Sequence, residues 1–170
     1  MSILPVIKNR RSIRAYEPKP VEKEKVEAIL RSAMYSPSAR HTRAWEFVVL
    51  TNPELIFQLG ELKAGGEHVK QAPVVIAVVS DEHDHWLEDA SIVATHIYLE
   101  ATNQGLGTCW THIHSSQTLD GDSCEEEVKK LLAIAPNKRV LCLMPLGYPA
   151  EKKEPHTDEE YEEDKIKWVE

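Results

Sequence analysis

Cysteine, glycine and aromatic residues are scarce in this sequence. Its 170 residues include three cysteines and seven glycines, and aromatic side chains make up 6% of the chain. The cysteines, Cys109, Cys124 and Cys142, are odd in number and form no CxxC pair. This pattern indicates neither a disulfide framework nor a thiolate zinc site, and it predicts a reducing compartment, the cytoplasm.

Long apolar runs are missing as well. The longest run, residues 72–79, has eight residues, whereas a membrane-spanning helix needs about 20. The first residues lead directly to Lys8, Arg10 and Arg11, without the apolar segment of a signal peptide. The sequence therefore predicts a soluble protein without a membrane partner.

Positive charge is in deficit. The chain has 20 Lys and Arg against 28 Asp and Glu, which gives a net charge of −8. This balance argues against a nucleic-acid binder that relies on general electrostatics. The deficit is uneven, because residues 1–43 contain ten basic and four acidic residues. A local anion site near the N-terminus is compatible with this distribution.

Length and composition predict one domain over residues 1–170. A chain of 170 residues with 42% hydrophobic content corresponds to about one domain and can form a core without staples. Residues 151–170 form an acidic C-terminal extension with nine Asp or Glu and four Lys, which closes with Ile166, Trp168 and Val169. Because tryptophan has a large apolar area to bury, the extension is predicted to cross to a partner subunit.

The spacing of apolar residues, interrupted by proline and glycine, predicts alternating helices and strands. Helices are expected at residues 21–33, 52–62, 86–104 and 125–133, and strands at residues 47–50, 73–79, 108–113 and 139–146. The segment 86–104 is apolar around its circumference and is expected at the centre of the domain. The predicted fold class is α+β, with a central, mainly antiparallel or mixed sheet of four to five strands surrounded by helices.

The segment Arg10-Arg11-Ser12-Ile13-Arg14 places three guanidinium groups and a hydroxyl within five residues. Arginine binds phosphate through a planar, bidentate fork and stays charged at physiological pH, so the segment is competent to bind a phosphomonoester. An arginine-rich pentapeptide by itself is more often a solvated surface. The segment alone therefore leaves both interpretations open.

Two further segments carry candidate ligand contacts. Residues 36–45 (SPSARHTRAW) combine hydroxyls, cations and an aromatic ring, which is typical of ligand-binding loops and also of irregular connections. Residues 105–110 (GLGTCW) lack a complete Rossmann or P-loop pattern, and their glycines either cap a helix or allow close approach of a flat ring. Cys109 is interpreted as a buried structural thiol within a strand, because no histidine is placed to activate it.

Two His-x-His pairs, His83 with His85 and His112 with His114, offer a metal-binding alternative. Residues i and i+2 of a strand face the same way, so either pair could chelate zinc. The spacing specifies no third ligand. The preferred interpretation therefore contains no metal, and a zinc enzyme is kept as an alternative.

Four segments resemble, in order, the signatures of the nitroreductase family of FMN-dependent oxidoreductases, namely residues 10–14, residues 36–38 with 45–49, residues 105–110 and residues 146–149. The resemblance implies an α+β homodimer with an FMN at each subunit interface. It also implies ping-pong chemistry, in which NAD(P)H reduces the flavin and a small acceptor such as a nitroaromatic or a quinone is reduced afterwards. No catalytic side chain is expected, because the flavin carries the hydride chemistry.

The resemblance assigns the phosphate side of the cofactor to basic residues. Arg10 and Ser12 resemble contacts to the phosphate, Arg14 is similar to a contact nearer the pyrimidine edge of the ring, and Arg11 is a weaker candidate. Lys153 resembles the late basic residue that closes the phosphate site in the family, and Lys152 could serve in its place.

Other contacts implied by the resemblance involve the ring. Pro37, Ser38 and Ala39 resemble the loop that a partner subunit places against the isoalloxazine. The family segment that passes the dimethylbenzene and N5 side of the isoalloxazine is resembled by Thr108, Cys109 and Trp110.

The loop departs from the usual family pattern Asn-x-Gln-Pro-Trp. His41, Arg43 and Ala44 stand where Asn, Gln and Pro are usual. The asparagine hydrogen-bonds the pyrimidine edge through an amide that both donates and accepts, and a histidine does both only in its neutral form. His41 remains a candidate cofactor contact. A flavin-binding dimer with no reductive role is a further alternative.

Overall fold

The computed structural model of the chain describes residues 2–170. Its sheet has five strands, β1 (Trp45–Leu50), β2 (Val74–Asp81), β3 (Gly107–Thr108), β4 (Thr111–His112) and β5 (Lys138–Gly147). The strand order is β1-β2-β5-β3, and β4 also pairs with β5. All of these strand pairs are antiparallel. The predicted α+β class and the mainly antiparallel sheet are confirmed.

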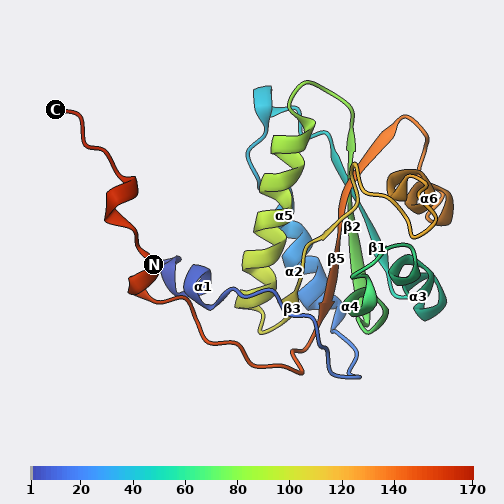
Figure 1. Cartoon of the computed structure of the whole chain (residues 1–170), viewed down its shortest axis with the longest axis horizontal. Helices are drawn as coiled ribbons and strands as arrows, with labels where there is room; N and C mark the ends of the chain where they lie inside the picture. The colour runs from blue at the N-terminus through green and yellow to red at the C-terminus, as the bar shows by residue number, and fades with distance from the viewer. Residues whose placement is uncertain (1) are drawn as a thin grey trace.

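Helices cover both faces of the sheet (Figure 1). One face carries α2 (Lys23–Met34) and α5 (Trp86–Asn103), and the other carries α3 (Pro53–Glu61), α4 (Glu67–Lys70) and α6 (Cys124–Leu131). The remaining elements lie in connecting or terminal segments and are α1 (Leu4–Asn9), η1 (Ala39–His41), η2 (Asp158–Glu160) and η3 (Glu163–Lys165). Among residues 2–170, no helix combines the length and apolar character needed to cross a lipid bilayer.

Strand β2 lies in the middle of the core and is buried on both sides. Val74, Ile76 and Val78 pack toward α2 and α5, whereas Val75, Ala77 and Val79 pack toward α3 and α6, as the period of two in a strand requires. A register shift between Val78 and Val79 marks a bulge in the pairing with β5. Because helices cover both faces, β2 can be a continuous apolar run although it is antiparallel.

Side-chain caps explain where several helices begin. The side chain of Asn52 accepts the N–H groups of Glu54 and Leu55 at the start of α3. The Ser123 hydroxyl accepts the N–H of Glu126 at the start of α6. Each cap satisfies backbone donors that have no partner within the first helical turn.

Two expectations about local structure are wrong. Residues 108–113 do not form one strand, because the N–H of Trp110 binds the hydroxyl of Tyr98 at 2.7 Å and so interrupts the ladder between β3 and β4. Helix α5 does not lie at the centre of the single chain. Its inner face packs on the sheet, whereas its outer face leaves Leu87 and Ile92 39% and 36% exposed.

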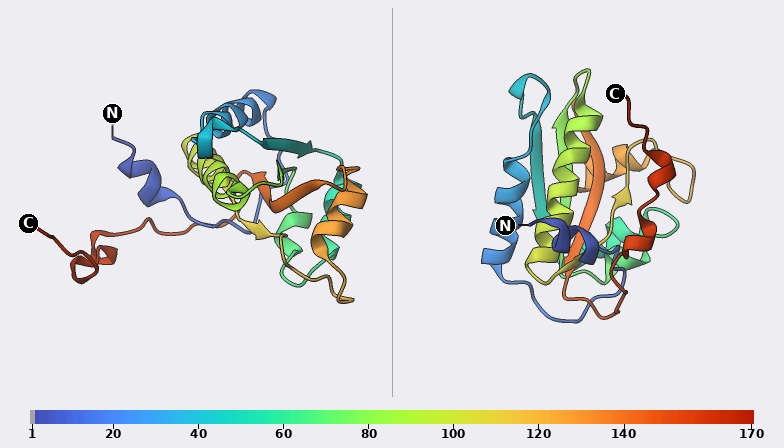
Figure 2. Two further views of the ribbon diagram at one scale, coloured as in Figure 1. Left: turned by 90° about the horizontal axis from the view of Figure 1, so that it is seen from above. Right: turned by 90° about the vertical axis from the view of Figure 1, so that its left-hand side faces the viewer.

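The two ends of the chain project from the body side by side. Figure 2 shows the N-terminal residues with α1 and the residues after 155 extending away from the sheet on the same side. Lys8 pairs with Asp158, and the N–H of His156 donates to the carbonyl oxygen of Lys8 at 2.9 Å. The side chain of Trp168 remains 84% exposed. That the extension crosses to a partner stays a prediction.

Candidate functional site

The segment Arg10–Arg14 lies between β3 and the chain that follows β5. Ser12 forms a parallel bridge with Thr108, and the N–H of Ile13 donates to the carbonyl oxygen of Thr108 at 3.0 Å. On its other edge, the N–H of Ala150 donates to the carbonyl oxygen of Ala15 at 2.9 Å. Backbone pairing therefore brings together three of the segments that carry the family resemblance.

Gly107 makes this close packing possible. A Cβ atom at this position would lie 2.6 Å from Cβ of Ile13, which a real side chain cannot tolerate. Gly105 has a different role, because its φ of +73° ends α5 in the left-handed conformation that glycine favours. Gly105 therefore caps the helix, which was one of the two expected roles of these glycines. At Gly107, the close approach is to the side chain of Ile13.

Side chains of the arginine segment alternate between its two sides. The Arg10 guanidinium lies 5.3 Å from the ring centroid of Tyr98, and the Ser12 hydroxyl lies 3.1 Å from the Tyr98 hydroxyl. Arg11 faces the opposite side, where it donates to the carbonyl oxygen of Glu154. There it lines a pocket of about 240 Å³ with Lys152 and Lys153. The geometry thus separates Arg11 from Arg10 and Ser12.

Tyr98 connects the pieces of this site, and sequence analysis did not identify it. Its hydroxyl accepts the N–H of Trp110 and shares a hydrogen bond with Ser12. Burial raises the pKa of Tyr98 above its ordinary value, so the phenol stays protonated at neutral pH. The one available signal was a polar-tipped ring on the inner face of an otherwise apolar helix.

The two candidate lysines behave differently. Nζ of Lys153 donates to the carbonyl oxygen of Ser12 at 2.7 Å and lies 3.4 Å from Glu151 Oε2. Lys152 is exposed and lies 3.5 Å from Glu154 Oε1. Lys153 is therefore the lysine that adjoins Ser12.

Two buried side chains, those of Thr108 and Cys109, lie beside Ser12 at the end of β3. The Thr108 hydroxyl is buried, and among residues 2–170 it has no hydrogen-bond partner. A buried hydroxyl without a partner is uncommon, and it suits a polar group of a bound ligand. Cys109 is 2% exposed, with its thiol 3.9 Å from the carbonyl oxygen of Trp110. It is a buried thiol, although it lies between two strands and not within one.

A buried histidine adjoins the same region and was also missed from sequence. His68 Nε2 lies 2.8 Å from the Thr111 hydroxyl. Burial, followed by the positive charge of Arg14, lowers the pKa of His68 below its ordinary value. His68 is therefore neutral at pH 7, with its ring held by Thr111 just beyond Trp110. It lies in the four-residue helix α4, which is too short to give a periodic signal.

The loop of residues 36–43 lies at the other end of α5 (Figure 1). The N–H of Ala39 donates to Asp89 in the first turn of that helix at 2.9 Å, whereas Tyr98 and Gly105 are near its end. Tyr98, which contacts Arg10 and Ser12, lies about 14 Å further along the helix axis than Asp89 at 1.5 Å per residue. A single chain therefore does not bring Pro37, Ser38, Ala39 and His41 to the arginine segment.

The His-x-His pairs have other partners. The ring centroids of His112 and His114 are 6.4 Å apart with the planes 85° to each other. His114 Nδ1 lies 3.2 Å from Glu125, and His83 Nδ1 accepts the N–H of His85. Across residues 2–170, no group of three or more His, Cys, Asp or Glu side chains is arranged to hold a metal ion. The geometry gives the zinc alternative no support.

A Tyr98→Phe variant is expected to have a free energy of unfolding about 1–3 kcal/mol lower than that of the wild type, because the N–H of Trp110 would lose its hydrogen-bond partner in a buried setting. Urea denaturation measures the difference. Tyr35→Phe is the matched control, since Tyr35 is 73% exposed. Equal stability of the two variants would contradict the connecting role of Tyr98.

Comparisons with known proteins identify the family of the chain. The model of the nitroreductase family matches residues 7–81 and 61–148. A protein of Methanothermobacter thermautotrophicus named "Putative NADH dehydrogenase/NAD(P)H nitroreductase" is 36% identical, covering 99% of this chain and 88% of the relative. The structure of an FMN-dependent nitroreductase from Clostridium difficile R20291 superposes with a TM-score of 0.94 at 33% identity, covering 98% of this chain and 99% of that one. This chain belongs to the nitroreductase family.

Proposed function

We propose that the protein is an FMN-dependent oxidoreductase that takes a hydride from NAD(P)H and reduces a small acceptor such as a nitroaromatic or a quinone, in a ping-pong sequence. The observation that carries the proposal is the convergence of Arg10, Ser12, Thr108 and Lys153 at one end of α5. Family membership and the similarity to an FMN-dependent nitroreductase support the same cofactor.

The donor set suits a flavin mononucleotide. Arg10 supplies positive charge and Ser12 a hydroxyl on the Tyr98 side of the segment, which fit a phosphate dianion. Lys153, on the side of Arg11, adds positive charge next to the Ser12 backbone. The buried Thr108 hydroxyl, which no other group among residues 2–170 satisfies, is a further polar contact for the bound molecule. Bound FMN supplies the hydride chemistry. No side chain of the protein is needed as a nucleophile.

Residues beside the phosphate region would set the polarity around the ring. Arg14 supplies a permanent positive charge, and the neutral ring of His68, held by the Thr111 hydroxyl, lies near it without adding charge. A cation near the pyrimidine edge stabilises negative charge that gathers there on reduction. The N–H of Trp110 binds the Tyr98 hydroxyl and the Thr111 hydroxyl binds His68, so these two residues link Tyr98 to His68.

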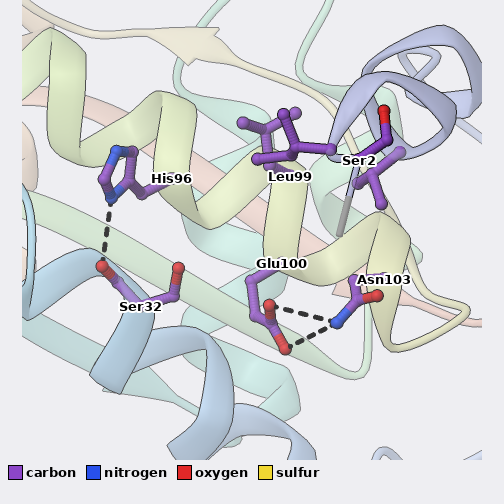
Figure 3. Close-up of a pocket in the computed structure, with 8 residues that line it drawn as sticks. Ser2, Ser32, His96, Leu99, Glu100 and Asn103 are labelled. Carbon is purple, nitrogen blue, oxygen red and sulfur yellow. Dashed lines mark hydrogen bonds between the residues drawn. The ribbon is translucent and has the colours of Figure 1, made fainter.

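The outer face of α5 supports a homodimer. A pocket of about 310 Å³ lies between α1 and α5 and is lined by Ser2, Ile3, Val6, Ser32, His96, Leu99, Glu100 and Asn103. Figure 3 shows Ser2 and Leu99 on the facing elements, with the ring of His96 hydrogen-bonded to Ser32 at 3.1 Å. A pocket of mixed apolar and polar lining beside the exposed apolar side chains of α1, Leu4 and Ile7, is a surface that a second copy of the chain would cover.

A second copy would also complete the cofactor site. Within one chain, the loop of residues 36–43 contacts Asp89 and the arginine segment contacts Tyr98, about 14 Å further along α5. Two copies that pack with α5 antiparallel would bring the loop of one chain to the arginine segment of the other. The site we propose therefore combines Arg10, Ser12, Thr108 and Lys153 of one subunit with Ser38, Ala39 and His41 of its partner.

An Arg10→Ala variant is expected to bind FMN about tenfold to a hundredfold more weakly, because a charge-assisted contact contributes about 1.5–3 kcal/mol. Fluorescence titration of the apoprotein with FMN measures the change. Arg31→Ala, which removes an exposed arginine of α2, is the control and should bind FMN like the wild type. Unchanged affinity in Arg10→Ala would refute the phosphate assignment.

Absorbance spectroscopy under anaerobic conditions tests the whole proposal. We expect a yellow protein whose flavin absorbance is bleached by NADH or NADPH and restored by a nitroaromatic or a quinone. A yellow protein that neither nicotinamide bleaches would instead favour the flavin-binding dimer without a reductive role. A colourless protein that contains zinc would favour the metal alternative.

We also propose the cytoplasm as the compartment. Cys109, Cys124 and Cys142 are all buried free thiols, a state that a reducing environment preserves.

A further inference from the structure

The loop of residues 36–43 has an unusual backbone. Arg40, His41 and Arg43 have φ values of +53°, +57° and +50°. Residues other than glycine adopt this left-handed backbone conformation only at a cost in free energy. Such residues cluster at functional sites, where surrounding contacts hold them. The contacts that hold this loop are therefore informative about its role.

Hydrogen bonds within the loop and from α2 provide part of the support. The N–H of Arg43 donates to the Ser38 hydroxyl at 3.0 Å, and its guanidinium donates to the carbonyl oxygen of Met34 at 3.1 Å. The N–H of His41 donates to the carbonyl oxygen of Ser38 at 3.1 Å. These bonds fix the curvature of the loop, but they do not attach it to α5.

Asp89 makes that attachment with both of its carboxylate oxygens. Oδ1 accepts the N–H of Ala39 at 2.9 Å, and Oδ2 accepts the hydroxyl of Thr42 at 3.4 Å. The two partners flank the strained residues Arg40 and His41. The Asp89 side chain is only 5% exposed, so water does not compete effectively for these bonds.

His83 lies on the other side of the same carboxylate. Its Nδ1 accepts the N–H of His85 at 3.3 Å, which leaves the ring proton on Nε2. That nitrogen lies 3.6 Å from Asp89 Oδ2 and, among residues 2–170, it has no hydrogen-bond partner. The buried carboxylate therefore faces the loop on one side and an imidazole on the other.

We propose that Asp89 is a positioning residue, which holds the loop of residues 36–43 in its left-handed conformation so that Ser38, Ala39 and His41 fit against the flavin of the partner subunit. This inference rests on the proposed function, because the loop has a cofactor to contact only in the FMN-bound dimer. Asp89 itself touches neither the cofactor nor the substrate.

A purely structural role for Asp89 predicts different results. A carboxylate in the first turn of a helix stabilises that helix through its dipole. Glu88 lies in the same turn, is exposed, and has the same charge. Glu88→Ala is therefore the matched control, because it removes the charge from the helix end and leaves the loop contacts intact.

Limited proteolysis measures the attachment of the loop without any flavin. Trypsin cleaves after arginine, and Arg40 and Arg43 lie in the loop. In the full chain, Asp89→Ala should be cleaved at these two sites about tenfold faster than the wild type, because a released loop opens more often. Thr42→Val removes one of the two bonds without changing α5. It should show a smaller increase and keeps the test valid if Asp89→Ala fails to fold.

Flavin binding measures whether the loop conformation serves the cofactor. Asp89→Ala should bind FMN about tenfold more weakly and, at saturating FMN, should have an altered visible circular dichroism spectrum. Asp89→Asn retains an oxygen that can accept the N–H of Ala39, so it should restore most of both properties. Glu88→Ala should match the wild type in both measurements.

Two results would overturn the inference. The first is tryptic cleavage of Asp89→Ala at Arg40 and Arg43 no faster than that of Glu88→Ala. The second is faster cleavage with unchanged FMN affinity and an unchanged flavin spectrum, which would detach the loop from the cofactor. If the wild type itself fails to bind FMN, the proposed function is wrong and the positioning role falls with it, whereas the cleavage rates still report whether Asp89 holds the loop.

Discussion

A Glu125→Gln variant is expected to lose about 3 kcal/mol of unfolding free energy, because it removes one partner of a buried ion pair. Glu125 is 5% exposed. It accepts hydrogen bonds from Arg139 Nε at 2.8 Å and from the N–H of Val140 at 2.8 Å, and it lies 3.2 Å from His114 Nδ1. Glutamine keeps the size of the side chain but removes the buried charge partner of Arg139, whose remaining carboxylate partner is the exposed Glu82 at 2.6 Å.

Urea denaturation at several pH values measures this effect. Burial by itself would raise the pKa of Glu125, but hydrogen bonds from Arg139 and Val140 lower it to about 2. A carboxyl whose folded pKa lies below its ordinary value of 4.5 stabilises the fold above pH 4.5. This stabilisation is lost as the pH falls from 4.5 toward 2, so the variant should approach the wild type at the acidic end.

Glu127→Gln is the control for this measurement. The side chain of Glu127 is 31% exposed and pairs with Lys130, which is 70% exposed, on α6. An exposed pair contributes at most about 1 kcal/mol. If both variants lose the same small amount of stability, Glu125 is not the anchor between α6 and β5 that its contacts indicate.

Deletion of residues 157–170 is expected to weaken the proposed dimer by at least about a hundredfold. The extension carries Trp168 and Val169, each 84% exposed in the single chain. Burial of a tryptophan against a partner contributes about 4–6 kcal/mol at 25 cal/mol per Å² over 150–250 Å², and each 1.4 kcal/mol changes the dissociation constant tenfold. Sedimentation velocity over a dilution series measures the dissociation constant, and FMN retention should fall with it.

A pair of point variants separates the tryptophan from the rest of the extension. Trp168→Ser should reproduce most of the loss, whereas Lys167→Ser, which changes the preceding residue, should leave the dimer intact. A truncated protein that stays dimeric and retains FMN as well as the wild type would show that the extension contributes nothing to assembly.

The sheet and its helices could be predicted from sequence because their signals are local. Residues 73–79 are a continuous apolar run, and the cap at Asn52 and the glycine at Gly105 mark helix ends through short-range chemistry. The expected strand over residues 108–113 is wrong for a non-local reason. Its ladder is broken by Tyr98, which lies 12 residues earlier in another element, and periodicity within the segment contains no sign of that contact.

The candidate site was accessible from sequence only in part. The arginine cluster with Arg10 and Ser12 stands out by composition, and Thr108 could be named through the family resemblance, although their roles as cofactor contacts remain proposals. Tyr98 and His68 could not be found in this way, because they act through partners far along the chain. The division of Arg10 from Arg11 likewise depends on the extended backbone beside β3, which fixes the side that each residue faces.

The separation of the loop and the arginine segment along α5 makes the proposed dimer suitable for complementation between two defective chains. A homodimer of Arg10→Ala chains has two faulty phosphate sides, and a homodimer of Asp89→Ala chains has two released loops. In a mixed dimer, one site receives both defects and the other receives neither, because its arginine segment comes from one chain and its loop from the other. Two preparations that each bind FMN weakly, when unfolded and refolded together, should therefore recover wild-type FMN affinity in half of the sites of their hybrid.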